Sequence, residues 1–182
     1  MKFQIQHLKE ASSTNTLVRQ FADEGAKEGL VLVADYQTQG RGKPGRQWIS
    51  PPGKNLLFSL LLRPPVPPSK APLLTQIACR SVAKVLKNSL GIDSTFKRPN
   101  DILVQGKKIC GVLVETASGS NGKLQSVVVG IGLNVNADST ALSPEAISIK
   151  EIKGQIVDRQ KLLDEILFQL KNDIQVLYAN PA

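Results

Sequence analysis

Residues 40–48 combine three glycines and a proline with three cations, Arg41, Lys43 and Arg46. Glycine and proline disfavour both a helix and a regular strand, so we expect a loop here. A loop whose backbone can approach a ligand closely, and whose cations converge, suits a ligand that carries phosphate. The same stretch is also compatible with an ordinary basic surface loop, so the rest of the chain must decide between the two.

Further polar clusters interrupt the apolar segments of the chain. Most of them fall where a strand or a helix is predicted to end, which is where binding and catalytic sites are usually built. Polar residues in such places can also be turn residues and nothing more. The clusters are Ser13-Thr14-Asn15, Gln37 with the glycine-rich loop, residues 97–101, Lys107-Lys108 with Gly111 and Glu115, and residues 130–136.

The elements that must position these clusters follow from hydrophobic periodicity and from cap and turn residues. Gly25 and Gly91 are natural ends for two helices, and Gln105-Gly106 predicts a tight hairpin. Strands joined by hairpins, with helices at intervals, predict an α+β fold in which helices cover a sheet. The predicted helices lie within residues 12–25, 72–90 and 158–177, the predicted strands span 30–35, 56–62, 94–97, 102–104, 107–115 and 124–133, and a polar turn is expected at 118–123.

Length and composition limit the class of protein. The 182 residues suit a single domain, residues 1–182, and 41% of them are hydrophobic, as in globular proteins. No apolar run approaches the roughly 20 residues of a membrane helix, and the N-terminus lacks the apolar core of a secretion signal. We therefore expect a soluble cytoplasmic protein.

Cys79 and Cys110 match no metal or redox spacing and are predicted to be buried free thiols. The single histidine, His7, excludes any site that needs two histidines.

The net charge of +8 indicates an anionic partner, which could be nucleic acid, a nucleotide or an acidic protein. Nucleic acid is poorly supported, because the cations do not gather on one helix and only 4% of the residues are aromatic. The spacing G-x-G-x-x-G occurs at residues 40–45, but no helix is predicted directly after it, as a dinucleotide site would require, and no G-x-x-x-x-G-K-[ST] is present. A nucleotide, if bound, must therefore be held by another device.

Taken together and in this order, the clusters resemble those of the biotin protein ligases, enzymes that attach biotin to a lysine of a carrier protein. Each segment is short, but the ordered set spans residues 13–136 and is specific to this family. The resemblance implies a mixed, largely antiparallel sheet flanked by helices, which is the class II synthetase-like catalytic-domain fold of biotin and lipoate protein ligases. The matching segments are Ser13-Thr14-Asn15, Gln37-Thr38-Gln39-Gly40-Arg41-Gly42-Lys43-Pro44-Gly45-Arg46-Gln47-Trp48, Lys97-Arg98-Pro99-Asn100-Asp101, Lys107-Lys108-Ile109-Cys110-Gly111-Val112-Leu113-Val114-Glu115 and Gly130-Ile131-Gly132-Leu133-Asn134-Val135-Asn136.

The resemblance implies a reaction in two steps. Biotin and ATP, with Mg²⁺, give biotinyl-5′-AMP and pyrophosphate. A lysine of a biotin carboxyl carrier protein, from acetyl-CoA carboxylase or a similar carboxylase, then attacks the mixed anhydride and releases AMP. The first step brings together two anions, the biotin carboxylate and the α-phosphate, so fixed cations are needed.

The resemblance also assigns residues to these steps. Lys108 matches the family's central catalytic lysine and should bridge the carboxylate and the α-phosphate, while Lys107 should face the other side of the strand. Arg41 should contact the activated carboxyl-phosphate. The implied biotin-binding residues are Ser13, Thr14, Asn15, Gln37, Gly40, Arg41, Lys108, Gly111, Val112 and Leu113. The implied ATP- and adenylate-binding residues are Arg41, Gly42, Lys43, Arg46, Trp48, Lys97, Asn100 and Asn134, and Asp101 is the implied Mg²⁺ ligand.

Some of these residues also have purely structural interpretations. Trp48 could stack on the adenine or simply anchor the loop in the core. Ser13 could cap the first helix, bind biotin, or do both. Asn100 and Asp101 could form only a turn after the proline.

The chain departs from the family pattern in two places. Arg98 stands where the family usually has tryptophan, and Lys43 stands where it often has a second arginine, so the hold on the adenylate is expected to differ. The last predicted helix ends close to Ala182, so we expect a short form without the family's small C-terminal β-domain. Without an N-terminal DNA-binding domain, neither a repressor role nor DNA binding is expected. Many relatives are dimers, and a homodimer is compatible with the sequence.

Two other functions are compatible with the chain. A lipoate or octanoate protein ligase or transferase shares the fold and also uses a lysine beside a fatty acyl group, but the arginine–glycine loop and residues 97–101 favour biotin. A non-catalytic binding module would use its basic surface to dock nucleic acid or an acidic protein without consuming ATP.

Overall fold

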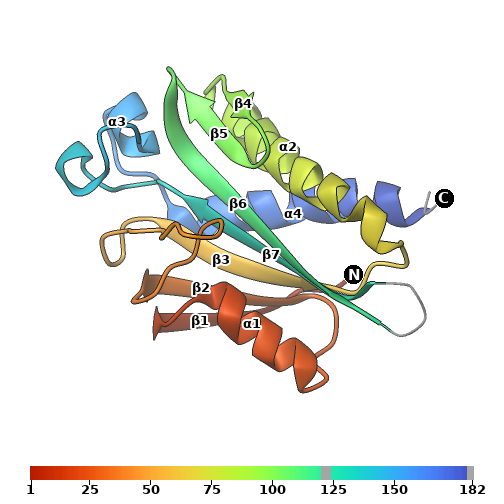
Figure 1. The fold of residues 1–182 in the computed structure, drawn as a ribbon. Coiled ribbons are helices and arrows are strands. Elements are labelled where there is room, and N and C mark those ends of the chain that lie inside the picture. The colour runs from red at the N-terminus through yellow and green to blue at the C-terminus, as the bar shows by residue number, and fades with distance from the viewer. Residues whose placement is uncertain (120–123, 180–182) are drawn as a thin grey trace.

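The computed structural model describes residues 1–119 and 124–179, and a seven-stranded sheet in the order β1-β2-β3-β7-β6-β5-β4 forms its centre (Figure 1). β1 and β2 run parallel, and the other neighbouring strands run antiparallel. The mixed, largely antiparallel sheet expected from the sequence is therefore confirmed. The strands are β1 (Gln4–Ala11), β2 (Leu30–Gln37), β3 (Leu56–Leu62), β4 (Thr95–Lys97), β5 (Asp101–Val104), β6 (Lys107–Ser118) and β7 (Leu124–Leu133).

Helices cover both faces of the sheet (Figure 1). α2 (Ala71–Leu90) and α4 (Arg159–Ala179) pack on one face and form the larger core, whereas α1 (Thr14–Asp23) packs on the other. β3 is apolar over most of its length because it is buried on both faces. Leu60 and Leu62 belong to the larger core, and Leu61 lies under α1. The α1 face also carries the candidate site, beside the N-terminal end of that helix.

Most of the predicted elements are confirmed, and β3 and β7 have the predicted bounds. The β5–β6 hairpin turns at Gln105 and Gly106, whose φ angles of 52° and 77° fit the left-handed turn that such a hairpin prefers. Both cysteines are free and buried, as predicted, and burial raises the pKa of Cys79 to about 11. None of the described helices combines the length and the apolar character needed to cross a bilayer.

Other features differ from the expectation. β1 was not predicted, because it is an edge strand with mostly exposed residues and therefore lacks a clear apolar alternation. The short α3 (Ile149–Lys153) and the 3₁₀ turns Pro68–Lys70 and Ser139–Ala141 are too brief to show a period. Ser13 occupies the N-cap position of α1, but its side chain makes no capping hydrogen bond. Of the two roles considered for Ser13, helix capping by the side chain is therefore wrong. Of the predicted turn at 118–123, residues 120–123 lie outside the described residues.

Candidate active site

One pocket gathers most of the residues that the sequence singled out. It lies over β6 and β7, beside the N-terminal end of α1, and the glycine-rich segment forms another side. Three predicted residues, Gly40, Lys97 and Asn134, do not line it. The predicted residues that do are Ser13, Thr14, Asn15, Gln37, Arg41, Gly42, Lys43, Arg46, Trp48, Asn100, Asp101, Lys108, Gly111, Val112 and Leu113, and they are joined by Gln47, Phe58, Gly130, Ile131 and Gly132.

Glycines of β6 and β7 form the floor of this pocket. Gly111 and Gly132 lie opposite each other in the sheet, and the Trp48 ring lies against both. A Cβ atom at Gly132 would be 2.6 Å from this ring, and one at Gly111 would be 3.0 Å from it. A Cβ atom at Gly130 would be 1.9 Å from Oδ1 of Asn15. Glycine is therefore required at these positions by the close approach of other side chains.

Lys108 reaches the pocket because β6 contains a bulge. In a regular strand, residues three apart point to opposite faces, so Lys108 and Gly111 would be separated. The pairing of β5 with β6 skips Ile109, and Ile109 and Cys110 both pack into the larger core. The extra residue places Lys108 on the same face as Gly111. Lys107 is exposed and does not line the pocket, so the expected difference between the two lysines is confirmed.

The ammonium group of Lys108 has two partners in the pocket. Its Nζ lies 2.8 Å from Oδ1 of Asp101 and 5.3 Å from the centre of the Trp48 ring. The ion pair is only partly exposed, at 33% for the lysine side chain and 16% for the carboxylate side chain. An indole face attracts a cation at this distance. A substrate anion that approaches Lys108 must therefore share the ammonium with Asp101 or replace that carboxylate.

The backbone of Lys108 is fixed on two sides. Its N–H donates to the carbonyl of Glu145 at 2.8 Å, and its carbonyl accepts from the N–H of Ile147 at 3.0 Å. Nδ2 of Asn134 donates to the same carbonyl at 3.4 Å. Asn55, which the sequence did not single out, donates in turn to Oδ1 of Asn134 at 3.2 Å. Asn134 is thus buried behind Lys108, and its contact with the adenylate stays a prediction.

A chain of hydrogen bonds organises the end of the pocket next to α1. Oε1 of Gln37 accepts from the backbone N–H of Thr14 at 2.8 Å and from its hydroxyl at 3.1 Å. The buried hydroxyl of Ser59 lies 2.7 Å from Oγ1 of Thr14 and 2.6 Å from Oδ1 of Asn15. Sequence reasoning missed Ser59, although a lone hydroxyl in the apolar strand β3 was a usable signal.

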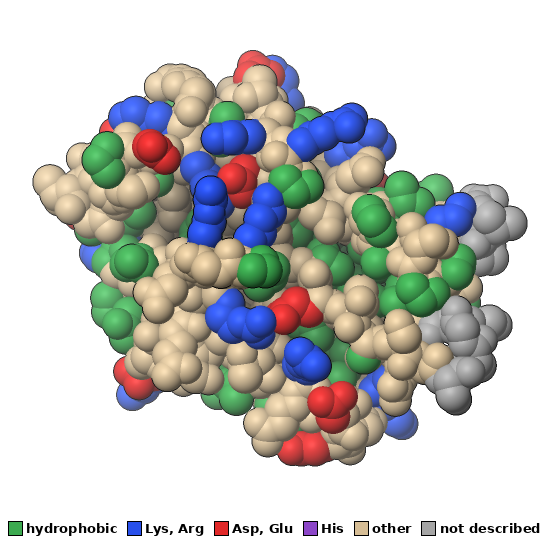
Figure 2. Space-filling model, in the orientation of Figure 1, with side chains coloured by type: hydrophobic (Ala, Val, Ile, Leu, Met, Phe, Trp, Pro, Cys, Tyr) green, Lys and Arg blue, Asp and Glu red, His purple; other side chains and the backbone are tan. Residues whose placement is uncertain are grey.

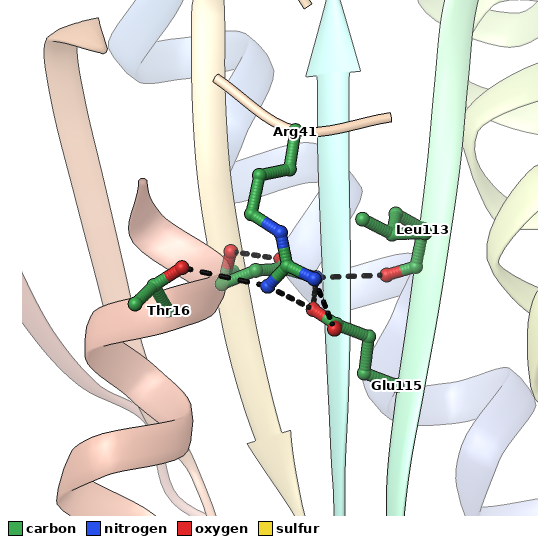
Figure 3. A network of polar contacts seen from close by, with 6 residues as sticks. Thr16, Arg41, Leu113 and Glu115 are labelled. Atoms are coloured by element: carbon green, nitrogen blue, oxygen red, sulfur yellow. Dashed lines mark hydrogen bonds and ion pairs between the residues drawn. The ribbon is translucent and has the colours of Figure 1, made fainter. Parts of the chain in front are cut away.

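The same network continues to Glu115 on β6. Nδ2 of Asn15 donates to Oε2 of Glu115 at 2.9 Å. The guanidinium of Arg41 binds both oxygens of that carboxylate, with Nη2–Oε1 at 2.8 Å and Nη1–Oε2 at 3.2 Å (Figure 3). Nη1 also lies 3.4 Å from Oγ1 of Thr16. Glu115 belongs to a segment singled out in the sequence, but no role was predicted for it.

Residues 40–48 close on themselves as a small hairpin, called the glycine hairpin below. The strand-like pairing within this segment is a single isolated bridge between Arg41 and Gln47. The segment is therefore a loop without a regular strand, as expected. A Cβ atom at Gly40 would be 2.2 Å from the carbonyl oxygen of Trp48, so Gly40 shapes the stem and does not line the pocket. The backbone bonds are Trp48 N–H to Gly40 O at 2.9 Å, Gly42 N–H to Arg46 O at 3.0 Å and Arg46 N–H to Lys43 O at 2.8 Å.

The tip of the glycine hairpin supplies cations without carboxylate partners. Lys43 and Arg46 form no ion pair with the described residues, whereas Arg41 and Lys108 each do. Figure 2 shows lysine and arginine side chains gathered on the face that carries the pocket, with a few acidic side chains between them. An anion entering the pocket therefore meets positive charge that is not already neutralised.

Comparison with known proteins agrees with this geometry. Residues 8–134 match the sequence profile of the biotin/lipoate A/B protein ligase family. The chain belongs to this family. The match covers most of the chain and includes every residue that lines the pocket. Glu145 and Ile147, which bind the backbone of Lys108, lie beyond it.

Individual ligases of the family are similar over most of the chain. The bifunctional ligase/repressor BirA of Bacillus spizizenii is 39% identical over 86% of this chain and 49% of its own length. The biotin–[acetyl-CoA-carboxylase] ligase of Paracoccus denitrificans is 34% identical over 86% of this chain and 67% of its own. The biotin protein ligase of Aquifex aeolicus, solved with biotin and ATP, superposes with a TM-score of 0.82 at 31% identity and covers 97% of this chain and 72% of that one. The expected ligase fold is thus confirmed, and this chain spans about half the length of the first curated relatives.

Two buried polar atoms of this ligase-family pocket have no hydrogen-bond partner among the described residues. They are Nε1 of Trp48, a donor, and Oδ1 of Asn100, an acceptor. The other end of the Asn100 amide donates to the carbonyl of Val112 at 2.6 Å, which fixes its orientation. Buried polar atoms are rarely left unpaired. One donor and one acceptor in residues that line the pocket therefore favour a ligand with complementary polar groups.

The described residues contain no cluster of three or more metal-binding side chains. Asp101 is the acidic residue among those that line the pocket, and it pairs with Lys108. Mg²⁺ in nucleotide enzymes is commonly held by one or two carboxylates together with the substrate phosphates. A single carboxylate fits that arrangement and does not fit a metal held by the protein alone.

Lys97 and Arg98 lie in a neighbouring groove between α2 and the β4–β5 connection. Asn100 and Asp101 line both this groove and the pocket, so the two hollows adjoin. Lys97 is therefore close to the pocket without lining it. Arg98, which replaces the tryptophan usual in the family, adds positive charge to this groove.

Proposed function

We propose that this chain catalyses the ATP-dependent formation of biotinyl-5′-AMP from biotin and the transfer of biotin to a lysine of a biotin carboxyl carrier protein. The observation that carries the proposal is the convergence of Lys108 with the glycine hairpin in one pocket. The two segments lie about sixty residues apart in the sequence, and the bulge in β6 is what brings the lysine to that face. The similar ligases of Paracoccus denitrificans and Aquifex aeolicus support the choice of biotin.

In the first step, an oxygen of the biotin carboxylate attacks the α-phosphorus and the bond to pyrophosphate breaks. Lys108 is proposed to lie between carboxylate and phosphate and to offset their repulsion, exchanging Asp101 for the substrates as its partner. Lys43 and Arg46 are proposed to contact the phosphate groups, because they are the hairpin cations without a carboxylate partner. Mg²⁺ bound to the phosphates would supply further positive charge, and Asp101 is its proposed protein ligand.

The polar network next to α1 is proposed to hold the ureido ring of biotin. Thr14, Asn15 and Gln37 supply hydroxyl and amide groups that Ser59 and one another already orient. Ser13 is free for this task because it makes no capping bond. Val112 and Leu113, which line the pocket, are proposed to contact the apolar ring and chain of biotin. Trp48 is proposed to contact the adenylate from above that floor, with its Nε1 donor available.

In the second step, the acceptor lysine must reach the carboxyl-phosphate. β5 pairs with β6 only as far as Gly111, so beyond Val112 the described part of β6 pairs with β7 alone. This open edge, residues 113–118, runs away from the pocket and is proposed to bind the carrier by adding a strand. Electrostatic attraction between the basic surface of this chain and an acidic carrier would speed their encounter.

The decisive experiment is biotin-dependent exchange of labelled pyrophosphate into ATP. We expect the wild-type chain to support exchange and Lys108→Ala to lower it by about 100-fold or more, since a group that stabilises charge in the transition state is lost. Lys107→Ala is the matched control and should leave the rate close to wild type, because that exposed side chain lies outside the pocket. No exchange in wild type would contradict the proposal and favour a binding module.

Calorimetry with biotin and with lipoate separates the two branches of the family. The proposal predicts measurable heat with biotin and none with lipoate at the same concentration. Tight binding of lipoate without binding of biotin would move the assignment to a lipoate or octanoate ligase or transferase.

A further inference from the structure

Glu115 lies where three separate parts of the chain meet (Figure 3). Its carboxylate belongs to β6 and receives hydrogen bonds from Asn15 of α1 and from Arg41 of the glycine hairpin. The Glu115 side chain is only 18% exposed, so its charge is partly removed from water and depends on these donors. A carboxylate bound by a guanidinium through both oxygens has a fixed direction as well as a neutralised charge.

The glycine hairpin has two side-chain anchors on the rest of the molecule. Trp48 lies against the glycine floor, and Arg41 binds Glu115 and Thr16. Within the described residues, the side chains of Lys43, Arg46 and Gln47 form no hydrogen bond or ion pair with other elements. Removal of either anchor therefore leaves the cationic tip of the hairpin attached through one side-chain contact and its backbone stem.

The Arg41 guanidinium has N–H donors that this pairing does not use. Three of the five N–H groups of a guanidinium are used on Glu115 and Thr16. The remaining N–H groups have no partner among the described residues and can therefore bind a ligand. The Arg41 side chain is 42% exposed, so without the carboxylate it would sample many rotamers in water.

We propose that Glu115 is a positioning residue that anchors the glycine hairpin over the pocket through Arg41, and that this anchor retains the adenylate intermediate. The proposal rests on the proposed function. Glu115 does not touch the reacting atoms; it fixes the direction of Arg41 and, with it, the position of Lys43 and Arg46. Loss of the anchor should therefore speed escape of biotinyl-5′-AMP more than it slows its formation.

The test begins with Glu115→Gln, which keeps the shape of the side chain and removes its charge. Labelled biotinyl-5′-AMP is formed in the site and its release is followed after an excess of unlabelled intermediate is added. We expect release about tenfold faster than in wild type, because losing one partner of a partly buried charge pair acts mainly on the off-rate. Glu10→Gln is the matched control, since Glu10 is an exposed strand residue whose side chain has no hydrogen-bond partner among the described residues.

A double-mutant cycle separates positioning through Arg41 from a general structural effect. The proposal predicts that Glu115→Gln has no further effect on release in an Arg41→Gln background. If the two substitutions act additively, Glu115 works through Asn15 or through stability, and the proposal is wrong. Thermal melts accompany each variant. Should Glu115→Gln fail to fold, Glu115→Asp replaces it and must give an off-rate between wild type and Arg41→Gln.

A second readout does not require adenylate formation. Trp48 is the single tryptophan of the chain, so intrinsic fluorescence reports on the hairpin alone. We expect acrylamide to quench Trp48 more strongly in Glu115→Gln than in wild type and in Glu10→Gln. Unchanged quenching in Glu115→Gln contradicts the proposed anchor even if the ligase activity is present. Absent activity in wild type, together with increased quenching in the variant, overturns the proposed function and leaves the anchor of the hairpin in place.

Discussion

Lys107 and Lys108 are adjacent in the sequence, but the bulge at Ile109 gives them different surroundings. In a regular strand, Lys107 would share a face with Gly111, because side chains alternate with a period of two. The bulge shifts this alternation by one residue and brings Lys108 to the pocket instead. The chemistry of the site therefore depends on one extra strand residue whose own side chain is buried in the core.

The contact between Gly132 and Trp48 predicts the effect of adding a single methyl group at Gly132. In Gly132→Ala the new Cβ atom would lie 2.6 Å from Cε2 and 2.8 Å from Cζ2 of the indole, so the ring must move away from the floor. We expect the tryptophan emission to shift to longer wavelength, and we expect pyrophosphate exchange to fall by about tenfold or more, as for other misplaced catalytic elements. Steady-state fluorescence and the exchange assay measure the two effects.

Gly154→Ala is the control for this substitution. Gly154 has a φ of +70°, and a Cβ atom there would meet nothing within 4 Å, so the variant tests the cost of backbone strain without touching Trp48. It should lower the melting temperature and leave the emission maximum unchanged. An unchanged emission maximum in Gly132→Ala would mean that the ring does not rest on the floor.

Residue types and spacing could predict which side chains gather in the site, but not which of them support the others. Lys108, Thr14 and Gln37 lie in the predicted pocket because short ordered segments identify them. The roles of Ser59 and Glu115 depend on neighbours more than forty residues away, in other elements. No local period reports such a contact. The placement of Asn134 behind Lys108 likewise follows from the way β7 leads into the segment before α3.

At the scale of elements, the strength of the apolar pattern decided what could be predicted. β3 and β7 are buried and rich in leucine or valine, so their bounds are visible in the sequence. β1 forms an edge of the sheet and exposes most of its residues, so hydrogen bonding to β2 holds it more than burial does. α2 and α4 have long apolar faces and pack against each other on the larger core.

Asp173 joins these two helices and gives a prediction about stability and pH. It lies on α4 and accepts from the buried Ser81 of α2 at 2.8 Å and from Lys84 at 2.7 Å. Partial burial alone would raise the pKa of Asp173, but hydrogen bonds from Lys84 and Ser81 more than offset this, and the pKa lies below its ordinary value of 3.8. The folded state therefore binds this proton more weakly than the unfolded state. The resulting stability is present above pH 3.8 and is lost as the pH falls through the folded pKa.

Asp173→Asn should lower the free energy of unfolding near neutral pH by about 0.5–1.5 kcal/mol, because Ser81 keeps an acceptor and Lys84 is half exposed. The difference from wild type should shrink as the pH falls below 3.8. Urea unfolding at pH 7 and at pH 3 measures it. Asp93→Asn is the matched control, since Asp93 pairs with Lys87 but its side chain is 82% exposed, so its loss should cost little. A difference that grows at low pH would contradict the assignment.

At the scale of the whole molecule, a partly buried polar junction joins the first helix to the last. The guanidinium of Arg63 donates to the carbonyl of Ala22, in the last turn of α1, at 2.9 Å and to that of Ala26, just after the helix, at 2.8 Å. The backbone N–H of Arg63 donates to Glu28 at 3.0 Å, and the hydroxyl of Tyr178 on α4 donates to the same carboxylate. This junction holds the far end of the helix whose N-terminal end carries Thr14 and Asn15. The position of the pocket therefore depends on the packing of both helical layers.

Net charge is also a property of the whole molecule, and at +8 it predicts how the second step responds to salt. If a carrier of opposite charge is drawn to the basic face seen in Figure 2, transfer from preformed biotinyl-5′-AMP should slow as KCl rises from 50 to 500 mM, because the screening length falls from roughly 14 Å toward 4 Å. Single-turnover transfer to the carrier measures this rate.

Hydroxylamine, a small uncharged acceptor, is the control, and its reaction with the same enzyme-bound intermediate should change little with salt. Equal salt dependence for both acceptors would place the effect on the adenylate itself, and a carrier reaction without any salt dependence would exclude docking by charge. The contrast between the two acceptors thus separates the field of the surface from the field of the pocket, where Lys43, Arg46 and Lys108 act over distances too short for salt to screen well.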